Sequence, residues 1–249
     1  MTSLSDGGCL KEKADRHSHI LFGVDDGAQT LEDSMAMLQL EYDSGVRTVY
    51  LTPHYRRDLF ECPSQRRLEH FEALRASAAQ RFPDLRLNLG CEVRVHMDVV
   101  ETIRSGSCFT MGDTGFVLLE FSAAAEKRYL LERCQALLIG GYTPILAHAE
   151  RCSAIRKDLE LLQTLVDMGV YIQMNADSIT GKEGLAWKWF CKKAMRRDLL
   201  HFIGSDAHDT KRYKPDLDAC ARYLERTMGA DYRDRILVNN PREILERSV

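Results

Sequence analysis

The sequence predicts one α/β domain built around a barrel of mostly parallel strands. Short apolar runs alternate with helical patterns along the 249 residues, and this alternation is typical of βα units. Histidine and acidic residues follow nearly every apolar run. Because a parallel barrel collects side chains at the carboxyl ends of its strands, both observations favour the same architecture.

Six apolar runs have the length and the β-branched or aromatic content of strands. They cover residues 47–52, 85–89, 116–119, 143–147, 170–174 and 201–204. A further strand precedes His17, and we expect the charged side chain of Arg16 to weaken it.

Helical patterns lie between the predicted strands. Thr30 is predicted as the N-cap of a helix that ends before Gly45. A second apolar helical face covers residues 68–74, and a third covers residues 159–166 and ends before Gly169. The regular change from strand to helix therefore predicts a parallel sheet rather than an antiparallel one.

Length and composition place the chain among single-domain globular proteins. We expect one barrel domain over residues 14–249, preceded by a loosely ordered extension over residues 1–13. The net charge of -3 argues against a nucleic-acid-binding protein, which would need a basic surface. The apolar runs are too short to insert into a membrane, and residues 1–16 lack the apolar core of a secretory signal. We therefore expect a cytoplasmic protein.

The eight cysteines are scattered, without the paired spacing of a zinc ribbon or a redox motif. We expect most of them to be reduced and buried. Cys191 and Cys220 each precede an arginine at the spacing of a cysteine-phosphatase loop. Both segments lack glycine and are helical in pattern, so their backbone amides are not free to hold a phosphate. We interpret both matches as accidental.

Candidate metal ligands recur through the chain. Two pairs, His17-Ser-His19 and Asp206-Ala-His208, place ligand side chains two residues apart, and an extended backbone would direct both members to the same side. Further ligand types lie at or just beyond the ends of apolar runs, namely His54, Glu92, Glu120 and His148. The other histidines lie in a helical pattern, a loop and the start of a strand, and are interpreted as structural: His70, His96 and His201.

Imidazole and carboxylate ligands without thiolates suit manganese, iron, zinc or magnesium, and favour manganese or iron over a thiolate-type zinc site. The ligands are too numerous for one ion, and Glu92 is suited to bridge two cations about 3.5–4 Å apart. Such a cluster lowers the pKa of bound water and holds phosphoryl oxygens. The residues therefore predict metal-assisted hydrolysis of a phosphate ester.

The order HxH, DDGA, TPHY, GCE, LLEF, AHAER and SDAH resembles the polymerase and histidinol phosphatase (PHP) superfamily. Residues 17–28 are most similar to the bacterial manganese-dependent protein-tyrosine phosphatases of capsule and exopolysaccharide operons. This resemblance covers nearly the whole chain and implies a distorted (β/α)7 TIM-like barrel. It also implies hydrolysis of phosphotyrosine, with the tail of a bacterial tyrosine autokinase as the partner.

The resemblance further implies a cluster of two or three ions, manganese before iron, zinc or magnesium. The implied ligands are His17, His19, Glu92 and Asp206 for one ion, Glu92, Glu120 and His148 for the second, and Asp26, His54 and His208 for the third. Arg151 would act in catalysis by binding the substrate phosphate through two hydrogen bonds. Further candidates for phosphate binding, with solvated surface charge as the alternative, are Arg56, Arg57 and Arg212.

Other functions remain open at this point. A small-molecule phosphatase such as histidinol-phosphate phosphatase would use the same ligands but an enclosed pocket, whereas a phosphotyrosine peptide needs an open one. A non-catalytic barrel is disfavoured because buried ligands without metal are costly. The net charge of -3 gives no support to a nuclease. The sequence is compatible with a homo-oligomer.

Overall fold

The computed structural model describes residues 12–245, so nearly all of the expected extension over residues 1–13 lies outside the described residues. Within this range nine strands form two parallel sheets, ordered β1-β2-β4 and β3-β5-β6-β7-β8-β9. The strands are β1 (Lys13–Ser18), β2 (Val46–Leu51), β3 (His54–Tyr55), β4 (Arg86–Leu89), β5 (Glu92–Arg94), β6 (Phe116–Glu120), β7 (Thr143–Leu146), β8 (Tyr171–Asn175) and β9 (Phe202–Gly204).

The two sheets join into a barrel of seven strand paths. β3 continues β2, and β5 continues β4, in each case after a break of two residues. The barrel closes where β9 meets β1, since Ser18 forms a parallel bridge with Ala207 and the His19 amide donates to the Ala207 carbonyl (2.9 Å). The predicted seven-stranded, distorted barrel is therefore confirmed, with two of its strands interrupted.

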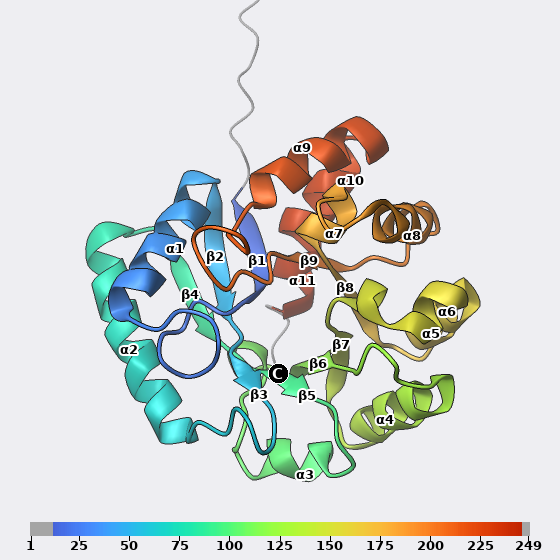
Figure 1. Ribbon diagram of the computed structural model, residues 1–249, viewed down its shortest axis with the longest axis horizontal. Helices are drawn as coiled ribbons and strands as arrows, with labels where there is room; N and C mark the ends of the chain where they lie inside the picture. The colour runs from blue at the N-terminus through green and yellow to red at the C-terminus, as the bar shows by residue number, and fades with distance from the viewer. Residues whose placement is uncertain (1–11, 246–249) are drawn as a thin grey trace, which may run out of the picture.

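Helices surround the barrel, as Figure 1 shows in a view down its axis, with α1 and α2 on one side and α4, α6 and α8 on the other. The α-helices are α1 (Leu31–Asp43), α2 (Ser64–Arg81), α3 (Val99–Arg104), α4 (Lys127–Ile139), α5 (Ser153–Lys157), α6 (Leu159–Asp167), α7 (Ala176–Thr180), α8 (Leu185–Arg196), α9 (Leu217–Met228), α10 (Ala230–Asp234) and α11 (Asn240–Leu245). Shorter helical turns are η1 (Met111–Asp113), η2 (Ala149–Arg151) and η3 (Arg235–Asn239). No helix of the described part is long and apolar enough to cross a membrane.

The predicted helix starts and stops follow from local chemistry. Thr30 caps α1 through a capping box, in which its side chain accepts from the Asp33 amide and the Asp33 carboxylate accepts from the Thr30 amide. The chain turns away from α1 at Gly45, whose φ of 83° suits glycine. The apolar face of α6 is buried through Leu161, Leu162 and Leu165. The three predicted helices are thus confirmed.

The prediction that Arg16 weakens the first strand is wrong. All six residues of β1 are buried, and the strand begins at Lys13, one residue before the expected domain start. Successive side chains of a strand point to opposite faces, so Arg16 points away from the face of its neighbours. Its guanidinium lies 4.2 Å from the centre of the Tyr50 ring, which offers a cation–π partner.

Candidate metal centre

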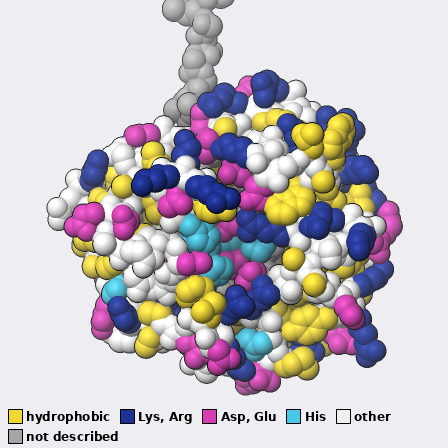
Figure 2. Space-filling view, in the orientation of Figure 1, with side chains coloured by type: hydrophobic (Ala, Val, Ile, Leu, Met, Phe, Trp, Pro, Cys, Tyr) yellow, Lys and Arg dark blue, Asp and Glu magenta, His cyan; other side chains and the backbone are white. Residues whose placement is uncertain are grey.

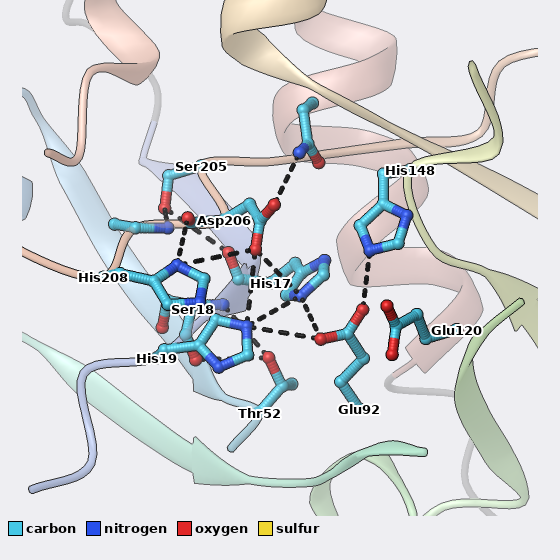
Figure 3. Close-up of polar contacts among 12 residues, drawn as sticks. His17, Ser18, His19, Thr52, Glu92, Glu120, His148, Ser205, Asp206 and His208 are labelled. Atoms are coloured by element: carbon cyan, nitrogen blue, oxygen red, sulfur yellow. Dashed lines mark hydrogen bonds and ion pairs between the residues drawn. The ribbon is translucent and has the colours of Figure 1, made fainter. Parts of the chain in front are cut away.

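The candidate ligands converge at the carboxyl ends of the strands. His17 lies near the end of β1, His19 and Asp26 follow β1, and Glu120 ends β6. The remaining ligands lie in the last segments of the other strand paths or just after them. Figure 3 shows the side chains from β1, β5, β6 and the segments after β7 and β9 pointing toward one another. Closure of the barrel therefore brings together residues that are up to 191 positions apart, from His17 to His208.

Three groups of these side chains have ligand atoms within 4.8 Å of one another. The groups are His17, His19 and Glu92; His54, Glu92 and Glu120; and His19, Asp26, His54 and His208. They share members, so they form one connected cluster rather than three separate sites. The resemblance implied a set of Glu92, Glu120 and His148. In the structure, the residue grouped with Glu92 and Glu120 is His54 instead of His148.

Glu92 lies at the centre of the cluster. Its Oε1 is 2.7 Å from His148 Nε2, and its Oε2 is 2.9 Å from His54 Nδ1 and 3.2 Å from His17 Nε2. The buried Oε2 atom has no hydrogen-bond partner of suitable geometry within the described protein. Burial alone raises the pKa of Glu92, but the neighbouring imidazoles of His17 and His54 hold it well below its ordinary value. The carboxylate is therefore ionised and suited to bridge two cations.

Hydrogen bonds set the orientation of the first histidine pair. His17 Nδ1 lies 3.2 Å from Gln173 Oε1, and His19 Nδ1 lies 2.8 Å from Asp25 Oδ2. Both partner atoms are acceptors, so each Nδ1 carries a proton, and each Nε2 is the ring atom left for a metal ion. The two Nε2 atoms lie 3.1 Å apart and face the same point. This is the tautomer and the orientation that a metal ion requires.

Sequence reasoning missed the residues that hold these ligands. Gln173 accepts at Oε1 from the His148 amide (2.7 Å) and donates from Nε2 to Asn175 (2.9 Å), which determines the orientation of its amide. Asn175 in turn donates to Asp206 Oδ2 (2.8 Å). Asp25 accepts from His19 and from the His54 amide (2.8 Å). The polar residues that end β8, and the second acid beside Asp26, were the available signals.

Two ligands have a left-handed backbone. His148 has φ of 31° and Asp206 has φ of 54°, a region that non-glycine residues rarely adopt. The extended backbone assumed for the 206–208 pair is therefore wrong at its first residue, although His208 Nδ1 still lies 3.8 Å from Asp206 Oδ1. Such strain at a cluster of polar side chains indicates a functional site.

Arg151 lies on η2 beside the cluster. Its Nη1 donates to Asp206 Oδ2 (2.7 Å) and its Nη2 donates to Glu183 Oε1 (3.2 Å). Burial alone lowers the pKa of Arg151, but the charges of Asp206 and Glu183 hold it above its ordinary value. The guanidinium is therefore a permanent positive charge next to a candidate metal ligand, as binding of an anion requires.

The other predicted arginines differ in their positions. Arg57 is held by Asp98 and Thr102 (both 3.2 Å), and the exposed Arg56 forms a backbone bridge with Phe60. Arg212 is exposed and lines a cavity together with Arg151. Of these three, Arg212 is therefore the one placed beside the expected phosphate contact.

A further arginine was not predicted. Arg94 Nη1 lies 2.9 Å from Glu120 Oε1, next to it in the register of β5 and β6. Because Glu92 and Arg94 are two residues apart on one strand, both side chains point to the same face. Two arginines, Arg94 and Arg151, thus each pair with a carboxylate of the candidate site.

The residues interpreted as structural lie outside the cluster. His70 stacks on Phe22, and His96 contacts Thr102. His201, at the start of β9, accepts from the Ile172 amide, and burial lowers its pKa to about 4. Each of these three histidines thus has a partner outside the candidate metal cluster.

The cysteine-phosphatase matches are helical. Cys191 lies in α8 and Cys220 in α9; both are buried, and burial raises the pKa of both thiols. They are therefore neutral and inaccessible, unlike a nucleophilic thiolate. Seven of the eight cysteines lie within the described residues, and all seven are free thiols, as predicted; Cys9 lies outside that range.

A cavity of about 490 Å³ opens over the cluster, and Asp26, Asp206, His208, Arg151 and Tyr213 contribute to its lining. Figure 2 shows the histidines in a hollow at the centre of this face, bordered by basic, acidic and hydrophobic side chains. The side chain of Asp26 is 54% exposed, so the outer edge of the cluster is in contact with solvent. The site is thus open at the surface rather than enclosed.

Known proteins are similar to this chain in both sequence and fold. The family of capsular polysaccharide synthesis proteins, CpsB/CapC, matches residues 13–246. Tyrosine-protein phosphatase CpsB of Streptococcus pneumoniae is 33% identical over 236 residues, covering 93% of this chain and 97% of that protein. Tyrosine-protein phosphatase YwqE of Bacillus subtilis is 30% identical over 217 residues, covering 87% and 85%.

Solved structures show the same relationship. A crystal structure from a study of YwqE and CpsB, described as metal-dependent tyrosine phosphatases, superposes with a TM-score of 0.87 at 28% identity and covers 95% of both chains. Histidinol phosphate phosphatase of Lactococcus lactis has a TM-score of 0.58 at 13% identity, over 89% of this chain and 94% of that one, and so shares the fold. From the match over residues 13–246 and these relatives, the chain belongs to the CpsB/CapC family.

Proposed function

We propose that this protein is a metal-dependent tyrosine-protein phosphatase that hydrolyses the phosphate ester of phosphotyrosine. The observation that carries the proposal is the cluster of imidazoles and carboxylates around Glu92, with Arg151 beside it. The relatives named as tyrosine-protein phosphatases, which match nearly the whole chain, support the choice of substrate. The open cavity favours a phosphorylated side chain of a protein over a small metabolite such as histidinol phosphate.

The side chains present fit two or three divalent cations. Nitrogen and oxygen donors converge, the Nε2 atoms of His17 and His19 face one point, and the buried Glu92 Oε2 has no hydrogen-bond partner among residues 12–245. This set of donors suits manganese or iron, with zinc or magnesium as alternatives. The resemblance to manganese-dependent phosphatases makes manganese the proposed metal. The proposed ligands are His17, His19, Asp26, His54, Glu92, Glu120, His148, Asp206 and His208. When bound, such ions activate water and neutralise phosphoryl charge.

The protein supplies orientation and charge. Arg151 is proposed to bind two phosphoryl oxygens, and its contacts with Asp206 and Glu183, which hold the guanidinium in position, support this role. Arg212 borders the same approach and is proposed as a second phosphate contact. Because the thiols of Cys191 and Cys220 are buried and neutral, we expect water rather than a side chain to attack phosphorus.

The biological setting follows from the family. We propose that the substrate is a phosphotyrosine protein of capsule or exopolysaccharide synthesis, in particular the tyrosine-rich tail of a bacterial tyrosine kinase. The proposed location is the cytoplasm, and the proposed catalytic unit is the barrel domain, alone or in a homo-oligomer. The net charge of -3 gives no support to a nucleic-acid partner.

The decisive experiment is phosphatase activity on a tyrosine-phosphorylated peptide and on histidinol phosphate, after chelation and again after manganese is restored. We expect activity on the peptide that is lost with chelator and returns with the metal. A preference for histidinol phosphate would refute the proposed substrate, and peptide hydrolysis indifferent to chelator would refute the metal-dependent mechanism.

Two variants assign the activity to the cluster. Asp206→Asn keeps the left-handed backbone, which asparagine tolerates, but removes the charge, so we expect activity to fall by at least a hundredfold. His96→Ala removes a histidine whose ring contacts Thr102 instead of the cluster, and we expect activity within about twofold of wild type. Equal losses in the two variants would contradict the assignment.

A further inference from the structure

A second cavity, of about 580 Å³, adjoins the cavity over the metal centre. Arg151 and Tyr213 line both cavities, so the two meet at the arginine that we expect to hold the phosphate. The rest of the lining comes from α7, α8 and the segments that follow α7 and β9. We call this second cavity the Trp187 pocket, after the aromatic side chain that α8 contributes to its wall.

Most charges in the Trp187 pocket are already paired. Lys182 Nζ lies 3.0 Å from Asp177 and 2.9 Å from Asp216. Glu183 is paired with Arg151 (3.2 Å). Both carboxylates of the wall therefore have a cationic partner within the described residues, while the second oxygen of Glu183, Oε2, is buried without a hydrogen-bond partner there.

Two aromatic rings and a guanidinium remain available. Trp187 is half-buried, with the guanidinium of Arg156 5.8 Å from its ring centre. Tyr213 is 41% exposed, and Asp209 Oδ1 accepts from its amide (3.2 Å), which helps to order this loop. Arg212 lies 5.0 Å from the centre of the Tyr213 ring. The pocket thus offers two aromatic rings within a mostly charged wall, with the positive charge of Arg212 at its edge.

We propose that the Trp187 pocket is a substrate subsite that holds a bulky apolar side chain next to the phosphotyrosine in the peptide. This inference rests on the proposed function, since it places the peptide relative to a phosphate on Arg151. Trp187 and Tyr213 supply the aromatic contact for that side chain. The volume of about 580 Å³ is in the range of pockets that enclose small organic groups. A substrate without flanking residues leaves the subsite empty.

The kinetic test compares phenyl phosphate, which has no flanking residues, with two phosphotyrosine peptides that differ only in having leucine or serine on both sides. For Trp187→Ala we expect KM for the leucine peptide to rise about tenfold, with phenyl phosphate kinetics unchanged within twofold. The matched control is Trp189→Ala. Trp189 lies two residues along α8, is 60% exposed and therefore points elsewhere.

An unchanged ratio between the leucine peptide and phenyl phosphate in Trp187→Ala would overturn the subsite. An equal loss on both substrates would also overturn it, because the tryptophan would then act on the metal centre. If wild type hydrolysed neither substrate, the proposed function would fail, and the binding measurement below would still test the pocket.

Fluorescence provides a readout that does not depend on turnover. The chain has two tryptophans, so Trp189→Phe leaves Trp187 as the sole reporter and Trp187→Phe leaves Trp189. With a non-hydrolysable phosphonate analogue of the leucine peptide, we expect a saturable emission change in Trp189→Phe and none in Trp187→Phe. The same response in both variants, or none in Trp189→Phe, would overturn the proposal.

Discussion

The most informative perturbation of the metal centre is Asp25→Asn, which changes a residue that is not itself a proposed ligand. Asp25 is buried and accepts three hydrogen bonds: Oδ2 from His19 Nδ1 (2.8 Å) and the His54 amide (2.8 Å), and Oδ1 from the Gly27 amide (3.0 Å). Burial alone raises the pKa of Asp25, but its contacts with His19 hold the pKa below the ordinary value. Asp25 is therefore the anion that orients His19.

The expected loss of metal affinity follows from the number of hydrogen-bond acceptors that the side chain at position 25 offers. Asparagine has one oxygen, so its amide nitrogen must face either the Gly27 amide or the two donors of His19 and His54. In either orientation one donor meets another, and the negative charge of Asp25 beside His19 is lost. Removal of such an orienting partner weakens metal binding by about 10- to 100-fold. At about 1.4 kcal/mol for each factor of ten, this corresponds to about 1.4–2.8 kcal/mol.

The assay is calorimetric titration of chelator-treated protein with manganese, with circular dichroism to verify the fold. Asp43→Asn is the matched control, because Asp43 is an exposed residue that accepts from Gln39 (2.7 Å) at the end of α1. We expect unchanged manganese affinity in the control. Wild-type affinity in a folded Asp25→Asn protein would refute the role given to Asp25 in orienting His19 and the tautomer inferred for His19.

Three further predictions test charge, pH and mechanism. Arg151→Lys keeps the charge but not the two-pronged geometry, so kcat/KM on a phosphotyrosine peptide should fall about 10- to 100-fold in steady-state assays. In chelator-treated protein, Glu92 has a folded pKa below the 4.5 of the unfolded chain, so its stabilisation is lost as pH falls below 4.5. His17 and His19 have folded pKa values above the 6.5 of the unfolded chain, so the stabilisation that they contribute is lost as pH rises above 6.5. Thermal unfolding of the chelator-treated protein should therefore show its highest Tm between pH 4.5 and pH 6.5. A Tm that only rises or only falls across this pH range would contradict these directions of the pKa shifts. Cys191→Ser should leave activity within about twofold and lower only the Tm, whereas an inactive but folded variant would restore the cysteine mechanism.

The sequence was informative wherever the evidence was local. The alternation of apolar runs and helices indicated a parallel barrel, and Thr30 and Gly45 marked the ends of α1. Ligand-type residues after apolar runs indicated a common site, because parallel strands end at the same edge. The misjudged effect of Arg16 shows where this reasoning stops, since the Tyr50 ring that accommodates its charge is contributed by another strand.

By itself, then, the sequence determined the alternation of strands and helices, the chemical types of the ligands and the edge of the barrel where they lie. Only the tertiary structure decided which atoms meet: that His54 joins Glu92 and Glu120, that Gln173 and Asp25 orient His17 and His19, and that a second cavity adjoins Arg151. The physical reason is that periodicity and capping act over a few residues. Contacts across the barrel depend instead on strand register, on closure between β9 and β1, and on side-chain orientations that neighbours from distant parts of the chain select.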